Sequence, residues 1–402
     1  MTNCNIGAAL YKAAAERQDA VALVTGKNGS YQQWTFQEVL ANSNRYANAL
    51  QKKGMQRGDR VMLMVRPSME FICLTYALFQ LGAVVILIDP GMGYKNLLRC
   101  IGSVQPKVLI AIPRVQLFSR LFRKPFATVK QRFCVGTPLF FGLCGISMQD
   151  AILKAGPDFT AVNTAEDELA AIIFTTGSTG PPKGVQYTHG IFYHQLQQIR
   201  DYYGIGPQDI DQPGFPLFGL FATALGAAAV IPDMDPTRPA ELDPVKFIRS
   251  LEDKQVTYSF GSPAIWNVVS RYCMEQNITL PVRKILMAGA PVPGELIERV
   301  QRIMPEDGDI HTPYGATESL PSTSITGREI LQETWEQTRI GKGTCVGRPL
   351  PGMRIGRGGR SRLPPDSLGE DRGPSGTPPE TAERGFPRLH LPDLARQSRD
   401  AS

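Results

Sequence analysis

Residues Thr175–Gly184 combine small hydroxyl side chains, glycines and one lysine, and they follow directly on an apolar run. That run, Leu169–Phe174, has the length and character of a buried strand. Glycines let backbone N–H groups approach an anion, hydroxyls add donors, and a lysine supplies a compact positive charge. The spacing therefore predicts a phosphate-binding loop at the end of a strand.

The order of residues within this loop excludes one large class of phosphate sites. A Walker A loop has glycine before its lysine and Ser or Thr after it, whereas Pro182 precedes and Gly184 follows Lys183 here. Every position instead meets the pattern T-[ST]-G-[ST]-T-G-x-P-K-G, which resembles the phosphate loop of the adenylate-forming superfamily. That superfamily includes acyl-CoA synthetases, luciferases and peptide-synthetase adenylation domains, and a surface loop is the alternative. The nucleotide-binding residues implied by this resemblance are Thr175, Thr176, Gly177, Ser178, Thr179, Gly180, Lys183 and Gly184.

Two later motifs complete a nucleotide site by the same resemblance. Gly289-Ala290-Pro291 matches the segment that lies along the adenine. Tyr314-Gly315-Ala316-Thr317-Glu318 matches Y-G-x-T-E, in which the tyrosine stacks on the base, the threonine contacts the α-phosphate and the glutamate holds magnesium. An aromatic face suits a purine and a carboxylate suits Mg²⁺, so the residue types fit these roles. The resemblance thus implies ATP and Mg²⁺ as cofactors.

Residues for the acyl group are expected between the phosphate loop and the adenine segment. His189 stands where relatives often carry a histidine; the sequence leaves open whether it orients substrate or is a hydrogen-bonded structural residue. Relatives carry a P-L-F segment beside the acyl pocket, frequently followed by a histidine, but Gly219 stands at that position here. The small side chains that follow would suit a long, unbranched chain, with core packing as the alternative. The expected catalytic residues are Lys183, Thr317, Glu318 and His189, and the expected pocket residues are Phe218, Gly219, Phe221, Gly261, Ser262 and Pro263.

The elements that must position these residues alternate between helical and strand patterns. Thr35 can cap a helix that ends near Gly54, Arg60–Val65 is a strand, and Ser68 opens a second helix before the strand Ala83–Ile88. Strand–helix–strand order with short turns indicates a parallel sheet and an α/β fold. The resemblance implies the large N-terminal domain of adenylate-forming enzymes over 1–355, with stacked αβαβα subdomains at about 1–190 and 191–345.

Composition excludes several other functions. The net charge of +6 over 402 residues comes without a basic stripe interleaved with aromatics, which argues against nucleic-acid binding. Seven cysteines without a C-x-x-C pair indicate reduced thiols and a cytoplasmic location. No signal peptide or membrane-spanning segment is evident. Residues 112–165 carry several basic side chains. These either contact an acidic partner or a lipid headgroup, or they form a solvated face; the solvated face is favoured.

The order of segments resembles one branch, the β-lactone synthetases of bacterial long-chain olefin biosynthesis. The segments that carry it include VMLMVRPSMEF, IPDMDPTRPA, AGAPVP and TPYGATESLP. This branch implies adenylation of a long-chain 3-hydroxy acid, followed by attack of its own hydroxyl to close a β-lactone. A long-chain acyl-CoA ligase is the runner-up, and a non-catalytic nucleotide- or acyl-binding fragment is the alternative of another class. The resemblance to this branch also implies a complex with a thiolase-like enzyme, a reductase and a decarboxylase. The length of the acyl chain, the stereochemistry of the hydroxyl and the oligomeric state stay open.

The pattern of the family stops after Ile355. Residues 356–402 contain no Val, Ile or Lys and are dense in Arg, Pro and Gly, which predicts a disordered tail. The G-W-x-x-T-G-D segment, the hinge and the C-terminal domain with its lysine are not found in this sequence. We therefore expect a domain that lacks its end and the small C-terminal domain, with a frameshift as the hypothesis for the abrupt change of composition.

Overall fold

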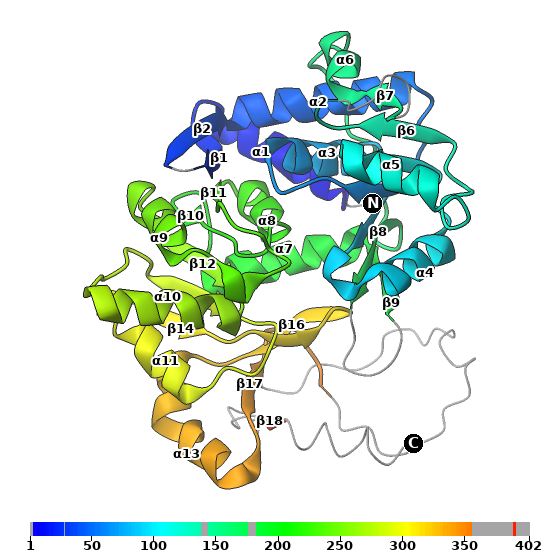
Figure 1. Ribbon diagram of the computed structural model, residues 1–402. Helices are drawn as coiled ribbons and strands as arrows, with labels where there is room; N and C mark the ends of the chain where they lie inside the picture. Colours follow the sequence, from blue (N-terminus) through cyan, green and yellow to red (C-terminus); the bar gives the residue numbers. More distant parts are fainter. Residues whose placement is uncertain (1–2, 28, 138–143, 176–181, 356–388, 391–402) are drawn as a thin grey trace, which may run out of the picture.

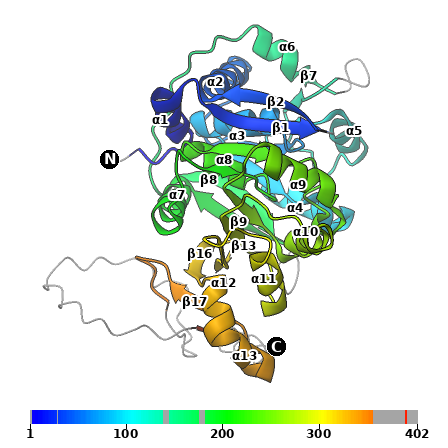
Figure 2. The ribbon, with the colours of Figure 1, turned by 90° about the vertical axis from the view of Figure 1, so that its left-hand side faces the viewer.

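The computed structural model describes residues 3–27, 29–137, 144–175, 182–355 and 389–390 of the chain. Within these residues two seven-stranded sheets are packed with helices, and a smaller sheet follows them (Figures 1 and 2). The α/β class predicted from the alternating pattern is confirmed.

The first sheet has the strand order β7-β6-β5-β3-β4-β8-β9, and its strands are parallel except for β9, which runs antiparallel to β8. Its strands are β3 (Arg60–Met64), β4 (Val84–Ile88), β5 (Val108–Ala111), β6 (Gln131–Cys134), β7 (Ile146–Ser147), β8 (Leu169–Thr175) and β9 (Lys183–Thr188). The helices along this part of the chain are α1 (Ile6–Arg17), α2 (Phe36–Lys52), α3 (Met69–Gln80), α4 (Tyr94–Val104), α5 (Pro113–Leu121) and α6 (Met148–Leu153).

The second sheet has the order β14-β13-β12-β10-β11-β1-β2. Its strands are β1 (Val21–Lys27), β2 (Ser30–Thr35), β10 (Ile210–Asp211), β11 (Ala228–Ile231), β12 (Tyr258–Gly261), β13 (Lys284–Met287) and β14 (Asp309–His311). The helices of this region are α7 (His189–Tyr203), α8 (Phe218–Ala224), α9 (Pro244–Asp253), α10 (Pro263–Gln276) and α11 (Gly294–Gln301).

A third sheet, in the order β15-β16-β17-β18, follows the second. Its strands are β15 (Tyr314–Ala316), β16 (Ser319–Ser324), β17 (Cys345–Pro349) and β18 (Leu389–His390), and the helical segments between β16 and β17 are α12 (Gly327–Glu329), Ile330–Thr334, α13 (Trp335–Gln337) and Thr338–Lys342. The strand β18 falls within 356–402, where composition predicts no regular structure. The other residues of that predicted tail lie outside the described part of the chain.

The helix starts follow from local capping chemistry. Thr35 and Glu38 form a capping box at the start of α2, and the Ser68 side chain accepts the Phe71 N–H at the start of α3. Both caps satisfy backbone donors that have no partner within the helix. The helices predicted from these residues are therefore confirmed.

One hydrophobic core joins the two large sheets. It contains Leu63 and Val85 of the first sheet together with Ala229 and Ile231 of the second. The Tyr76 hydroxyl on α3 donates to the Leu220 carbonyl on α8 at 2.8 Å, which adds a buried polar link across this core. Strands β1 and β2 belong to the second sheet, although residues 21–35 precede the first sheet in the chain. The sheets therefore do not follow a single division near residue 190, and subdomain bounds stay a prediction.

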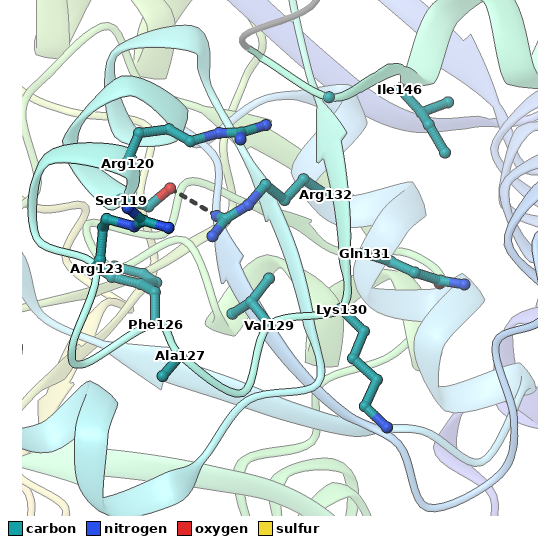
Figure 3. A pocket seen from close by; sticks show the side chains of 11 residues that line it. Ser119, Arg120, Arg123, Phe126, Ala127, Val129, Lys130, Gln131, Arg132 and Ile146 are labelled. Atoms are coloured by element: carbon teal, nitrogen blue, oxygen red, sulfur yellow. Dashed lines mark hydrogen bonds between the residues drawn. The ribbon is translucent and has the colours of Figure 1, made fainter.

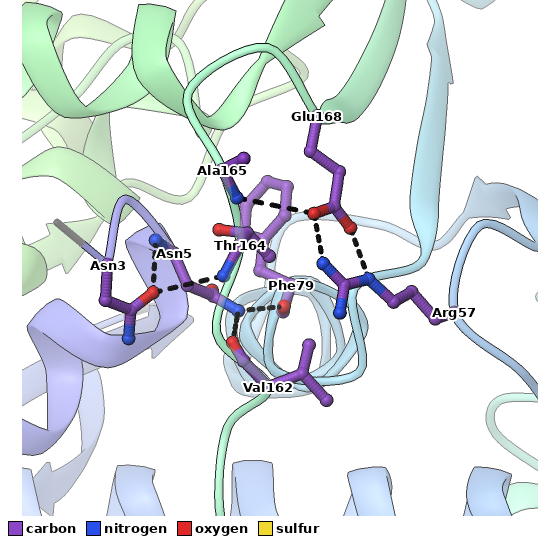
Figure 4. A network of polar contacts seen from close by, with 8 residues as sticks. All are labelled: Asn3, Asn5, Arg57, Phe79, Val162, Thr164, Ala165 and Glu168. Carbon is purple, nitrogen blue, oxygen red and sulfur yellow. Dashed lines mark hydrogen bonds and ion pairs between the residues drawn. The ribbon is translucent and has the colours of Figure 1, made fainter. Parts of the chain in front are cut away.

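A polar network fixes the chain that enters β8 (Figure 4). The Asn5 side chain donates to the carbonyl oxygens of Phe79 and Val162, each at 2.8 Å. The Arg57 guanidinium binds both oxygens of Glu168, with Nε to Oε1 at 2.6 Å. Because Glu168 directly precedes β8, these contacts fix the start of the strand that leads to the phosphate loop.

Over the residues described, none of the helices has the length and apolarity to span a membrane.

Candidate active site

The predicted phosphate loop joins two antiparallel strands. The register pairs Thr175 of β8 with Lys183 of β9 at the carboxyl end of β8. Lys183 is exposed there. The predicted contacts Thr176, Gly177, Ser178, Thr179 and Gly180, together with Pro181, lie outside the described residues.

Gly184 lets the two strands of this hairpin pack closely. A Cβ atom at Gly184 would lie 3.0 Å from Ile172 Cγ2 and 3.0 Å from Phe174 Cζ, closer than ordinary packing allows. The glycine therefore has a packing role beside Lys183, in addition to the phosphate contact that its position in the motif predicts.

The motif Tyr314–Glu318 forms a second hairpin next to the first. Tyr314 and Ala316 lie on β15, and Thr317 and Glu318 make the turn into β16. The Tyr187 hydroxyl on β9 donates to the carbonyl oxygen of Thr317. Burial, followed by the charge of Glu318, raises the pKa of Tyr187 to about 12, so its hydroxyl remains a donor at neutral pH. The structure thus brings the two motifs together.

The predicted adenine segment lies at the same edge of the second sheet as Tyr314. Gly289, Ala290 and Pro291 follow the carboxyl end of β13, and Tyr314 follows β14, which is parallel to β13. Loops at the carboxyl ends of parallel strands are the usual ligand sites of open α/β sheets. Gly289 has a φ of +96° and no atom within 4 Å of the position of a Cβ, which leaves an open ledge beside Ala290.

An aromatic cavity lies beneath these loops. Phe218 of α8 stacks on Phe260 of β12 with ring centroids 3.5 Å apart, and both line a cavity with Phe221 and Ile199. Its volume of about 20 Å³ holds roughly one water molecule. Phe218 and Phe221 thus line the cavity, and their place in an acyl pocket stays a prediction.

The other four predicted pocket residues do not line this cavity. Gly261, Ser262 and Pro263 form the end of β12 and the start of α10, where the Ser262 side chain accepts the Ile265 N–H as a helix cap. A Cβ at Gly219 would lie 3.5 Å from Ile231 Cδ1, against β11. A side chain at position 219 would therefore face the core of the second sheet.

The cavity contains a buried acid that the sequence does not reveal. Asp211 of β10 is fully buried and lines the cavity beside Tyr258, its register partner on β12. Burial raises the pKa of the Asp211 carboxyl well above its ordinary value, although the Phe260 backbone acts in the opposite direction. Burial therefore favours the protonated, neutral form of this carboxyl. Nothing in the run Asp209-Ile210-Asp211 marks which of its acids is buried.

His189 lies away from the phosphate loop. It follows β9 at the end opposite Lys183, about 20 Å along the strand at 3.3 Å per residue. Its ring is fully buried against Phe79, and neither ring nitrogen has a hydrogen-bond partner among the described residues. Burial lowers the pKa of His189 to about 4. The structure therefore does not bring His189 beside Lys183.

Glu318 is the residue predicted to hold magnesium. It is exposed at the turn between β15 and β16, and no cluster of three or more His, Cys, Asp or Glu ligands occurs in the described ranges. Mg²⁺ is commonly held by one or two carboxylates together with substrate phosphates. A single exposed carboxylate beside a phosphate loop fits that mode of binding.

Comparison with known proteins gives matches over most of the chain. The model of the AMP-binding enzyme family matches residues 10–357. An olefin beta-lactone synthetase of Xanthomonas campestris is 42% identical over 360 residues, which cover 86% of this chain and 62% of that protein. A long-chain-fatty-acid–CoA ligase of Thermus thermophilus is 25% identical over 332 residues, covering 81% of this chain and 60% of the ligase.

A solved structure shows the same fold. The long-chain-fatty-acid-CoA ligase FadD1 of Archaeoglobus fulgidus superimposes with a TM-score of 0.72 at 20% identity, covering 87% of this chain and 69% of that one. The predicted fold class is thereby confirmed. The chain spans about three fifths of the length of the two curated relatives.

Proposed function

Because the chain belongs to the AMP-binding enzyme family, we propose that it activates a carboxylic acid with ATP to an acyl adenylate and releases pyrophosphate. The observation that carries this proposal is the hydrogen bond from Tyr187 to the Thr317 carbonyl. It holds the phosphate-loop hairpin and the Tyr314–Glu318 turn next to each other, where a carboxylate and an α-phosphate must meet. Holding two reactants in place contributes strongly to the rate of such a step.

The residues divide this task between them. The Lys183 ammonium offsets negative charge on the phosphates, and the loop 175–184 supplies backbone and hydroxyl donors. Thr317 contacts the α-phosphate, and Glu318 holds Mg²⁺, which when bound neutralises further phosphate charge. The adenine lies between Tyr314 and the ledge at Gly289–Pro291. A carboxylate oxygen attacks the α-phosphorus, and the bond to pyrophosphate breaks.

The substrate that we propose is a long-chain 3-hydroxy acid. The support is the 42% identity to a relative named olefin beta-lactone synthetase, against 25% to one named long-chain-fatty-acid–CoA ligase. The aromatic cavity at Phe218, Phe221 and Phe260 is the start of the acyl pocket. Since the cavity has room for only about one water molecule, the stack of Phe218 on Phe260 must part to admit a chain.

The second step that we propose needs no further substrate. The 3-hydroxyl oxygen attacks the carbonyl carbon of its own acyl adenylate, the bond from that carbon to the AMP oxygen breaks, and the hydroxyl proton is released. The products are a β-lactone and AMP. A complex with other enzymes of olefin biosynthesis and a cytoplasmic location remain predictions of the resemblance.

The test is ATP–pyrophosphate exchange by this chain with a 3-hydroxy fatty acid, together with detection of the lactone by mass spectrometry. Exchange and lactone formation without coenzyme A are expected, and Lys183→Ala should lower exchange at least tenfold, whereas Lys246→Ala, a surface lysine of α9, should not. A product that forms only with coenzyme A would instead establish an acyl-CoA ligase. If a full-length relative exchanges and this chain does not, residues 1–402 act as a nucleotide- or acyl-binding fragment.

A further inference from the structure

The positive charge of the chain is concentrated in one segment. Residues 90–149 contain nine Lys or Arg and no Asp or Glu. The remainder of the chain has 34 Lys and Arg against 37 Asp and Glu, so this segment accounts for the whole net positive charge. Segments of one sign repel themselves and, when folded, usually face solvent or a ligand of the opposite sign.

Four of these cations meet at a cavity of about 620 Å³ between α5, β6 and the start of β7 (Figure 3). They are Arg120, Arg123, Lys130 and Arg132, and we call this cavity the cationic pocket. Arg120, Arg123 and Arg132 gather around Ser119, as Figure 3 shows. The volume is in the range of small-molecule sites.

These cations have no carboxylate partner within 4 Å in the part of the chain that the structure describes. Arg132 is half-buried and donates to the Ser119 hydroxyl at 2.7 Å, which orients its guanidinium toward the pocket. Burial, and then the neighbouring charge of Arg120, lower the pKa of Arg132. Bringing guanidinium groups together without a counter-charge costs free energy, which an anion in the pocket would offset.

The cationic pocket is separate from the candidate active site. It lies at the amino end of β6, whereas the phosphate loop follows the carboxyl end of β8. The strands β6 and β9 are five strand spacings apart in the first sheet, about 24 Å at 4.8 Å each. A ligand there does not touch Lys183.

We propose that the cationic pocket is a second ligand site of this protein, which binds an anion that carries phosphate groups. Guanidinium groups donate paired hydrogen bonds that match phosphate oxygens, and three of them around one hydroxyl provide such donors from several directions. The phosphate comes either from a free phosphate compound or from the headgroup of an anionic lipid. Leu121 and Phe122 at the end of α5 have exposed apolar side chains, which suit contact with a lipid surface. Lipid binding is therefore measured separately.

The experiment compares two double variants in a Lys183→Ala background, which weakens phosphate binding at the candidate active site. Arg120→Ala/Arg123→Ala removes two cations of the pocket. Lys95→Ala/Arg114→Ala removes two exposed cations of the same acid-free segment that do not line it. Binding of inorganic pyrophosphate is measured by calorimetry, and sedimentation is measured with phosphatidylcholine vesicles with and without phosphatidic acid. All four altered side chains are exposed, so both variants should fold, which circular dichroism checks.

The pocket variant should bind pyrophosphate about tenfold more weakly than the background protein, and the control variant should bind within twofold of it. Sedimentation with phosphatidic acid vesicles that falls in the pocket variant alone would identify a lipid headgroup as the source. Binding of pyrophosphate without sedimentation would identify a free phosphate compound. Equal binding by the two double variants, or no pyrophosphate binding by the background protein, would overturn the proposal.

Discussion

His189 shows at the scale of one residue how position in a motif and position in space can differ. The residue follows the phosphate loop closely in sequence, yet the length of β9, which begins at Lys183 and ends at Thr188, separates the two residues. Its buried, unpartnered ring packs on Phe79 instead. A short sequence motif gives only the spacing of residues along the chain. It does not show that an extended strand carries His189 away from Lys183.

We predict that His189 makes the stability of the protein depend on pH. Its pKa is about 4 in the folded chain against 6.5 ordinarily, so between these values the unfolded chain binds a proton that the folded chain does not. Stability is therefore lost as pH falls from about 6.5 toward 4, by about 3 kcal/mol in total. His189→Leu should remove this loss, which urea unfolding over that pH range measures.

The control for this prediction is His194→Asn, which alters an exposed histidine of the same helix and should keep the wild-type slope. His189→Leu should also retain pyrophosphate exchange. A variant with wild-type pH dependence, or one that folds but has lost exchange, would show that His189 acts in another way.

At the scale of elements, the hairpin β15–β16 carries Thr317 and Glu318 at its turn, and Gly315 makes that hairpin possible. A Cβ at Gly315 would lie 2.2 Å from the Ser319 carbonyl oxygen, which is backbone and cannot move aside alone. The sequence motif contains this glycine, but the reason for it is the close approach of the two strands. Only the structure shows that approach.

We predict that Gly315→Ala lowers the rate of pyrophosphate exchange at least tenfold, because the two strands must separate and displace Thr317. The free energy of unfolding should fall by about 1–3 kcal/mol. The control is Gly156→Ala at an exposed loop position where a Cβ meets no atom within 4 Å. Exchange at the wild-type rate by Gly315→Ala would contradict the proposed role of the turn.

Elements defined by local signals are the ones that the sequence predicts well. The predicted strand Ala83–Ile88 and the helices begun by Thr35 and Ser68 agree with the structure, since hydrophobic pattern and capping are local. Phe218 and Phe221 were predicted beside the acyl group and line the cavity, whereas Gly219 faces β11. Successive positions on a helix point to different faces, and the start of α8 has too little pattern to fix which.

At the scale of the whole molecule, the sheet pairing could not be predicted from the sequence. Leu23 of β1 pairs with Ala229 of β11, and the residues between them include the whole first sheet. No local sequence pattern identifies a strand-pairing partner that far along the chain. The buried position of Asp211 depends on the same long-range pairing, here with Tyr258.

This pairing leads to a prediction about unfolding. Since β1 crosses to the second sheet and one core contains residues of both sheets, neither sheet can lose its packing without exposing that core. We expect one cooperative transition for residues 3–355.

The chain has three tryptophans: Trp34 on β2, Trp266 on α10 and Trp335 on α13, all of them outside the first sheet. Their fluorescence therefore reports the second and third sheets, while far-ultraviolet circular dichroism also reports α2–α5. In urea the two signals should share one midpoint, and a fluorescence transition at lower urea than the circular dichroism transition would show that the sheets unfold separately.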